Sequence, residues 1–249
     1  MSDFIEGRRA ALEALKTKVP VKAVLVQKQQ KGQKPDKKLD DIVKQFKDEH
    51  IAVRYVDKSK LDHISSHGAH QGIALEVGGY PYVSLPEILE AASSKNELIL
   101  VLDHITDEGN LGAIIRSAEV VGAAGVILPA NRSAQVGVGV YKTSAGAAMH
   151  IKIARVANLS QALQTMKEAG FWVVGASEHA TQTLWQAPLE GKICLVAGSE
   201  GKGISPLVQK NCDFLVKLPQ RGQLESLNVA QATTAICYEW LRRFFDEEA

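Results

Sequence analysis

Short apolar segments alternate with amphipathic segments along most of the chain, and this alternation constrains the fold more than any other feature. A capping box at residues 84–87, with an early proline, predicts that a helix starts there. Strands are then predicted at 98–102, 125–128, 171–175 and 193–197. Helices are predicted at 110–122, at 158–169 with Asn158 as N-cap, and from Leu227 to Phe245. This order predicts an α/β fold with a mostly parallel sheet covered by helices on both faces.

The residues before this region form a separate small α/β pattern. Apolar runs predict strands at 21–26, 51–56 and 72–77, and an amphipathic segment predicts a helix at 36–49. The turn-rich stretch Gly78-Gly79-Tyr80-Pro81 is typical of a linker. We therefore expect one domain at 1–78, a linker with the first helix at 79–96, and a second domain at 97–249.

Charge differs between the two parts. The chain has 29 Lys and Arg against 28 Asp and Glu, a net charge of +1, so it has no global basic field. Residues 1–83 hold 15 basic and 11 acidic side chains, a net of +4, and the remainder is therefore −3. A nucleic-acid partner would thus be held by a local patch. The polar loop at 27–34, with Lys28, Lys31 and Lys34, is either solvated or a contact for RNA phosphates.

Several classes of protein are disfavoured by the sequence. The three cysteines lie far apart and form no CxxC pair, which argues against a zinc ribbon and favours reduced thiols in a cytoplasmic protein. The N-terminus has no apolar signal core, and the most apolar stretch is interrupted by charges, so we expect no membrane span. We also expect no metal, because His63, His67 and His70 have neither thiols nor a clear carboxylate set beside them.

Three glycine-rich or polar segments follow predicted strands, where an open α/β sheet binds its ligands. The first is EGNLGAIIRS, with Asn110 and Arg116, and its alternative interpretation is an ordinary strand-to-helix loop. The second is GSEGKGIS at 198–205, whose glycines permit a tight turn and close approach to a ligand. The third is ESLNVA, where Ser226 is a natural N-cap for the last helix and Asn228 has no evident packing role.

Other nucleotide and hydrolase motifs are missing from the sequence. The segment at 198–205 is neither a phosphate-binding P-loop nor a GxGxxG fingerprint. The strand at 98–102 does not end in the glycine turn of Rossmann-type methyltransferases, and no GxSxG elbow is present.

Taken together and in this order, the three segments resemble the SpoU (TrmH-type) RNA 2′-O-ribose methyltransferases. EGNLGAIIRSAEVVGAAGVIL resembles the first family motif, AGSEGKGIS the second and LPQRGQLESLNVAQATTAICYE the third. KTSAGAA at 142–148 matches a stretch between the first two motifs. EGRRAALEAL and HQGIALEV are similar to the N-terminal extension of the 23S rRNA guanosine-2′-O-methyltransferase branch. One departure is DEGN where many members have DPGN.

The resemblance implies a fold that periodicity could not supply. It implies a parallel α/β sheet with a deep trefoil knot at its C-terminal end (SPOUT-like), preceded by a small L30e-like RNA-binding domain. The implied cofactor is S-adenosylmethionine, held at Gly198, Leu218 and Leu227. The implied partners are RNA and a second copy of the chain in a homodimer, with neither DNA nor a membrane. The candidate RNA contacts in the first domain are Arg8, Arg9, Lys28, Lys31 and Lys34.

The resemblance also implies a catalytic set. Its members are Asn110, Arg116, Glu200, Ser226 and Asn228. Asn110 and Glu200 are expected to orient Arg116, which the family assigns as a general base. A guanidinium has no acceptor and a pKa above about 12, so we favour Arg116 as a group that holds a phosphate and stabilises the developing alkoxide. The alternatives are a tRNA 2′-O-methyltransferase and an inactive RNA-binding protein of the same fold.

Overall fold

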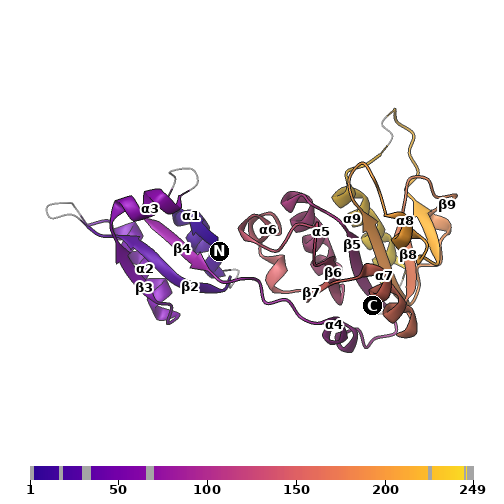
Figure 1. The fold of residues 1–249 in the computed structure, drawn as a ribbon, viewed down its shortest axis with the longest axis horizontal. Coiled ribbons are helices and arrows are strands. Elements are labelled where there is room, and N and C mark those ends of the chain that lie inside the picture. Colours follow the sequence, from indigo (N-terminus) through magenta and orange to yellow (C-terminus); the bar gives the residue numbers. More distant parts are fainter. Residues whose placement is uncertain are drawn as a thin grey trace. The chain divides into compact units, whose positions relative to one another are not determined.

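The chain divides into two compact units, Met1–Pro81 and Tyr82–Ala249 (Figure 1). A computed structural model describes residues 3–16, 19–29, 35–65, 70–223, 226–243 and 245. The division lies at the end of the turn-rich stretch at 78–81, within the expected linker.

The first unit contains a four-stranded mixed sheet in the order β1-β4-β2-β3. Its strands are β1 (Asp3–Glu6), β2 (Val21–Gln27), β3 (Val53–Val56) and β4 (Ile73–Val77). Strand β4 is antiparallel to β1 and β2, whereas β2 and β3 are parallel. The helices are α1 (Arg8–Lys16), α2 (Lys37–Asp48) and α3 (Lys58–Ile64). Helix α2 buries Leu39, Ile42, Val43 and Phe46, which confirms the predicted apolar face.

The second unit contains a parallel sheet of seven strands in the order β7-β6-β5-β10-β8-β11-β9. This confirms the predicted α/β class with a parallel sheet. The bounds are β5 (Glu97–Asp103), β6 (Gly125–Pro129), β7 (Ile153–Val156), β8 (Trp172–Ala176), β9 (Gln182–Thr183), β10 (Lys192–Gly198) and β11 (Phe214–Lys217). The carboxyl ends of these strands meet at one edge, where the glycine-rich segments begin.

Helices cover both faces of this sheet. Helices α4 (Leu85–Ala91), α7 (Leu159–Glu168) and α8 (Pro206–Gln209) contribute to a core that includes Ile99 and Val101 of β5. Leu98, Leu100 and Leu102 alternate with these residues and are fully buried as well, so the opposite face is also covered. Helices α5 (Glu108–Val120) and α9 (Val229–Arg242) pack against each other and reach the sheet at β6 and β10.

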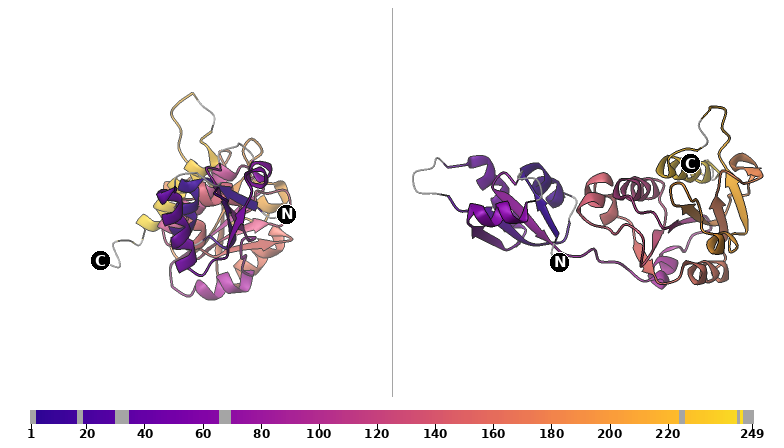
Figure 2. Two further views of the ribbon diagram at one scale, coloured as in Figure 1. Left: turned by 90° about the vertical axis from the view of Figure 1, so that its left-hand side faces the viewer. Right: turned by 45° about the horizontal axis from the view of Figure 1, so that its top comes forward.

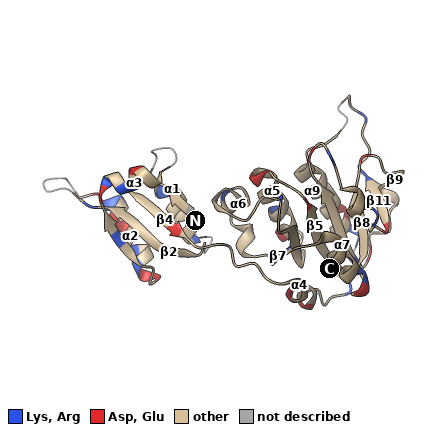
Figure 3. Cartoon of the chain, in the orientation of Figure 1, with Lys and Arg blue, Asp and Glu red and all other residues tan. Residues whose placement is uncertain are grey.

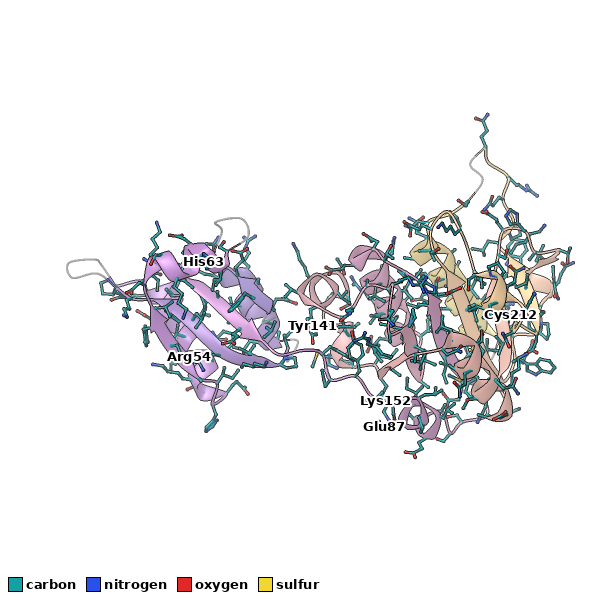
Figure 4. The ribbon with its side chains drawn as sticks, in the orientation of Figure 1. Arg54, His63, Glu87, Tyr141, Lys152 and Cys212 are labelled. Atoms are coloured by element: carbon teal, nitrogen blue, oxygen red, sulfur yellow. The ribbon has the colours of Figure 1, made fainter. Side chains whose placement is uncertain are left out.

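Helix α4 is anchored to β7 within the second unit. Its predicted capping box is confirmed, because Ser84 N donates to Glu87 Oε2 over 2.8 Å. Lys152 Nζ donates to the Glu87 carbonyl over 3.0 Å, and both residues are labelled in Figure 4. Ile88 packs closely over Gly125, where an added Cβ would lie 2.8 Å from the isoleucine side chain.

The structure adds elements that the sequence patterns did not predict. These are β1, β7, β9, β11, α1, α3, α6 (Val138–Thr143), α8 and the short helices η1 (Ala147–Met149) and η2 (Leu184–Gln186). Most of them are too short to show a clear period. None of the described helices is both long and apolar enough to cross a bilayer.

Candidate functional site

A cavity of about 420 Å³ lies at the carboxyl edge of the second sheet. The segments after β8, β10 and β11 line it, together with the first turns of α9. Residues 219–223, which follow β11, extend away from the body of the unit (Figure 2). The cavity brings together six of the predicted site residues: Gly198, Glu200, Leu218, Ser226, Leu227 and Asn228.

Gly198 shows why the cavity wall requires glycine. It ends β10, and a Cβ at this position would lie 2.0 Å from the backbone carbon of Gly203. The following turn is closed by two backbone hydrogen bonds between Ser199 and Gly203, of 3.0 and 2.8 Å. Gly201 and Gly203 have φ of +78° and +64°, values that side chains disfavour. Glycine at 198 thus permits the close approach of the two arms of this turn, and Ser199, Glu200 and Lys202 of the same segment also line the cavity.

Three side chains from the three predicted motifs form a hydrogen-bonded triangle. Asn110 Nδ2 donates to Glu200 Oε1 over 2.7 Å. Asn228 Nδ2 donates to Asn110 Oδ1 over 2.9 Å and to Glu200 Oε1 over 2.8 Å. Asn110 lies in the first turn of α5, where the Asp107 carboxylate accepts from its backbone N–H. The triangle therefore joins segments that lie far apart in the sequence.

Asn228, not Ser226, is the N-cap of the last helix. Asn228 Oδ1 accepts from the N–H of Ala230 over 2.9 Å and of Gln231 over 3.4 Å. The prediction for Ser226 was wrong because α9 begins at Val229, so Ser226 lies outside the helix. Ser226 is exposed and lines the cavity without a hydrogen bond to any described residue. The cap fixes the amide of Asn228 with its nitrogen toward Asn110 and Glu200.

Arg116 does not join the triangle. It lies two turns beyond Asn110 on α5 and its side chain is exposed. Within the described part of the chain it makes neither a hydrogen bond nor an ion pair. Asn110 and Glu200 bind each other and Asn228 instead, so the expectation that they orient Arg116 is not met by their contacts within one chain.

Asp103 is a residue of this edge that the sequence analysis missed. It ends β5 and is buried, with 1% of its surface exposed. Its Oδ2 accepts from Ser205 N over 2.7 Å, and its Oδ1 lies 2.5 Å from His104 Nδ1. The carboxylate thus ties the end of the segment that carries Glu200 to the segment that leads into α5. The sequence contains one signal for this role, because the charged Asp103 directly follows a run of five apolar residues at 98–102.

The candidate RNA contacts in the first unit differ in their surroundings. Arg8 forms a two-point ion pair with Asp36 and donates from Nε to the Gln71 carbonyl over 3.0 Å. Arg9 is exposed and has no partner among the described residues. Lys28 is exposed and lies 3.3 Å from Asp57. Lys31 and Lys34 lie outside the described residues. Helices α2 and α3 both carry basic and acidic residues, which are blue and red in Figure 3.

Among the residues that the structure describes, the cysteines and histidines form no competing site. Burial raises the pKa of Cys212, labelled in Figure 4, and of Cys237 to about 12, so both thiols stay protonated and weakly nucleophilic. In the described ranges, no three His, Cys, Asp or Glu side chains come together as metal ligands would. His70 is buried and hydrogen-bonded to Asp62 and to Gly72 N, and His67 lies outside the described residues.

Comparison with known proteins assigns both units. The SpoU rRNA methylase family matches residues 97–238, and the RNA 2′-O ribose methyltransferase substrate-binding family matches residues 4–83. A Bacillus subtilis protein named as a TrmH family tRNA/rRNA methyltransferase is 38% identical over 97% of this chain and 96% of its own length. A tRNA/rRNA methyltransferase described as uncharacterized, from Mycolicibacterium vanbaalenii, is 40% identical over 97% of this chain and 77% of its own length.

Solved structures have the same fold. The SpoU methyltransferase AviRb from Streptomyces viridochromogenes superposes with a TM-score of 0.75 at 23% identity, covering 99% of this chain and 91% of that one. A complex of the same enzyme with its cofactor AdoMet superposes equally well. A TrmH family protein from Porphyromonas gingivalis has a TM-score of 0.70 at 28% identity, covering 97% and 90%.

A substrate-binding unit followed by a parallel α/β unit, with a cavity at the carboxyl edge of the sheet, defines a two-domain RNA methyltransferase. This chain belongs to the SpoU rRNA methylase family.

Proposed function

We propose that the chain transfers a methyl group from S-adenosylmethionine to the 2′-oxygen of a ribose in RNA, at a guanosine of 23S rRNA. The observation that carries the proposal is the triangle of Asn110, Glu200 and Asn228 beside a cavity walled by Gly198. Each corner belongs to a different one of the three motifs that resemble the family.

The cavity suits a cofactor of this size and chemistry. Its volume of about 420 Å³ lies within the usual range for ligand pockets. Gly198 would allow backbone groups to approach the ligand, and Leu218 and Leu227 offer apolar contacts. When bound, S-adenosylmethionine supplies an electrophilic methyl group. The residues proposed to hold it are therefore Gly198, Leu218 and Leu227.

The triangle gives the site a fixed geometry for the nucleophile. A sugar hydroxyl is a poor nucleophile at its free pKa, so holding it in line contributes much of the rate. Both amide hydrogen bonds to Glu200 reach Oε1, so they fix the carboxylate of a residue that lines the cavity. We assign Asn110, Glu200 and Asn228 to positioning the ribose, with Ser226 beside them on the exposed segment.

Arg116 is assigned to the RNA backbone. Its guanidinium is exposed, carries a fixed positive charge and has no acceptor atom. It would hold a phosphate and stabilise negative charge on the 2′-oxygen.

Three structural features support finer parts of the proposal. Val120 of α5 and Tyr238 of α9 expose 56% and 49% of their surfaces on two helices that pack together, as a homodimer surface would. Strand β10 lies between β5 and β8 in the sheet, and the later helix α9 packs back against α5. This chain path is compatible with a trefoil knot. The small mixed sheet of the first unit with its three helices suits the proposed L30e-like domain.

The test is methyl transfer from labelled S-adenosylmethionine to separate pools of rRNA and tRNA. Arg116→Ala is measured beside Lys95→Ala, since Lys95 is also exposed but precedes β5 at the opposite edge of the sheet. We expect label on a ribose 2′-oxygen of large-subunit rRNA, lost in Arg116→Ala and retained in Lys95→Ala.

The other outcomes separate the alternatives. Label on tRNA alone would reject the rRNA substrate and keep the reaction. No label together with no binding of S-adenosylmethionine would favour an inactive RNA-binding protein of the same fold.

A further inference from the structure

The segment between β6 and α6, residues 130–137, is irregular but held at several points. Ser133 Oγ donates to the Ile105 carbonyl over 3.0 Å, and Ala134 N donates to the same oxygen over 2.7 Å. Val136 N donates to the Tyr82 hydroxyl over 2.8 Å. The carbonyl of Ala130 accepts from Arg155, whose guanidinium lies over the Tyr82 ring. This segment is therefore a fixed loop.

Arg132 is the residue that this fixed loop presents. Its φ is +54°, in the left-handed region that a long side chain disfavours. Its side chain is exposed and has no hydrogen-bond or ion-pair partner in the described part of the chain. Such backbone strain persists only where the surrounding structure imposes it, and it concentrates at binding and catalytic sites. The loop thus holds an unpaired guanidinium in a strained position.

The loop lies at the same edge as the hydrogen-bonded triangle. Strands β5 and β6 are parallel neighbours, so their carboxyl ends lie side by side. Ile105, which accepts from the loop, lies two residues before Asp107, and Asp107 caps α5 at Asn110. Beyond the loop, Gly139 packs so closely on Glu108 that a Cβ would lie 1.8 Å from its carboxylate. The middle of the loop is therefore tied to the segment that leads into α5, and the helix that follows the loop packs against the first turn of α5.

We propose that Arg132 binds a backbone phosphate of the RNA beside the nucleotide that is modified. The guanidinium fork matches phosphate oxygens, and a rigid loop lowers the entropy lost when they bind. The inference rests on the proposed function, because it takes the triangle as the place where the ribose lies. It adds a contact in the second unit, whose net charge of −3 gives no overall attraction for RNA.

The test compares Arg132→Gln with Lys95→Gln in the full chain. Binding of a large-subunit rRNA transcript is measured over a range of salt concentrations, together with the affinity for S-adenosylmethionine. Loss of one phosphate contact should reduce the slope of log K against log salt by about 0.7–0.9, which is about a fivefold loss of affinity at 0.15 M salt. We expect this loss in Arg132→Gln, with unchanged cofactor affinity, and no change in Lys95→Gln.

Arg132→Asn provides a second charge-removing variant, because asparagine tolerates the left-handed backbone better than other non-glycine residues. It should reproduce the loss of slope with an unchanged melting temperature. An RNA affinity and salt slope equal to those of Lys95→Gln would overturn the proposal.

Failure of the proposed function would look different. If the wild-type chain binds the transcript and transfers no methyl group, a reduced slope in Arg132→Gln still supports the contact while the function is rejected. A wild-type chain that binds no RNA would overturn both.

Discussion

At the residue scale, Asn228 performs two tasks with the two ends of one amide. Its oxygen caps α9 by accepting from two backbone N–H groups, and its nitrogen donates to Asn110 and Glu200. The cap leaves only one orientation of the amide that satisfies every partner. Stability of the helix and geometry of the site are therefore linked through a single side chain.

Substitution of Asn228 can separate these tasks. Asn228→Ser keeps a capping oxygen, so the melting temperature should stay close to that of the wild type, whereas Asn228→Ala should lose about 1 kcal/mol of stability. Both variants lose the amide donor that holds Glu200 in place, and misplacing a positioning group can cost about a hundredfold in rate, so kcat/KM should fall at least about tenfold in both. Thermal melts and methyl-transfer kinetics check this. Wild-type turnover in Asn228→Ser would show that the donor is dispensable.

The sequence predicted the residues of the triangle but not their connections. Asn110, Glu200 and Asn228 were named through the family motifs, and no spacing within those motifs predicts that the three side chains touch. Ser226 was predicted as the cap because serine is a common N-cap residue, yet asparagine two residues later has an equal preference. The start of α9 at Val229 decides between them, and helix boundaries are poorly determined by periodicity.

At the element scale, α5 and α6 approach closely at Gly112. An alanine Cβ there would lie 1.9 Å from Thr143 Oγ1 and 2.9 Å from the backbone nitrogen of Ser144. Thr143 Oγ1 also donates to the Glu108 carbonyl over 3.1 Å, in the turn that carries Asn110. The stretch KTSAGAA thus fixes the start of α5.

Gly112→Ala should therefore destabilise the protein although alanine normally favours a helix by about 1 kcal/mol. Overpacking against backbone costs about 1–3 kcal/mol, which lowers the melting temperature by about 2–4 °C for each kcal/mol in a chain of this size. The matched control is Gly79→Ala, where a Cβ would meet no atom within 4 Å. Equal melting temperatures for the two variants would contradict the close approach.

The start of α2 provides a pH-dependent contribution to stability. The Arg8 guanidinium beside Asp36 lowers the pKa of that carboxyl below its ordinary value, and the Leu39 N–H bond to the carboxylate acts in the same direction. Because the folded pKa lies below the unfolded one, the stabilisation is complete above the ordinary value of about 3.9 and is lost as pH falls through the folded value.

Arg8→Gln should accordingly lower the melting temperature at neutral pH, with the difference from wild type constant down to about pH 5 and closing below about pH 4. The effect is small, below about 1 kcal/mol, because the pair is partly exposed. Arg9→Gln is the control, since exposed Arg9 has no partner among the described residues. A pH-independent difference for Arg8→Gln would attribute its role to packing or to the Gln71 contact.

Sequence periodicity predicted the longer elements well and the short ones poorly. The apolar faces of α2 and α7 and the buried runs of β5 and β10 were evident because several turns or strand residues repeat the pattern. Strands β7, β9 and β11 have four residues or fewer and were missed. The order of strands, with β10 between β5 and β8, is set by long-range pairing that no local pattern encodes.

At the scale of the whole molecule, each unit has its own sheet and its own core. Leu25, Leu61 and Ala74 belong to the core of the first unit, whereas the larger core of the second unit includes Val101 and Val196. The cavity and the triangle lie entirely in the second unit. The excess of positive charge lies in the first unit. Residues 1–83 have a net charge of +4, and because residues 82 and 83 are uncharged, Met1–Pro81 carries all of it.

This separation predicts the behaviour of the second unit alone. A fragment of residues 82–249 should fold, because it keeps the complete seven-stranded sheet with helices on both faces, and it should bind S-adenosylmethionine as tightly as the full chain. Its affinity for RNA should fall at least about tenfold and become less dependent on salt, because the unit that carries the net charge of +4 is removed. Calorimetric titration with the cofactor and RNA binding over a range of salt concentrations measure the two effects. If the fragment kept full RNA affinity, recognition would lie in the second unit, and the positive charge of the first would then serve another role.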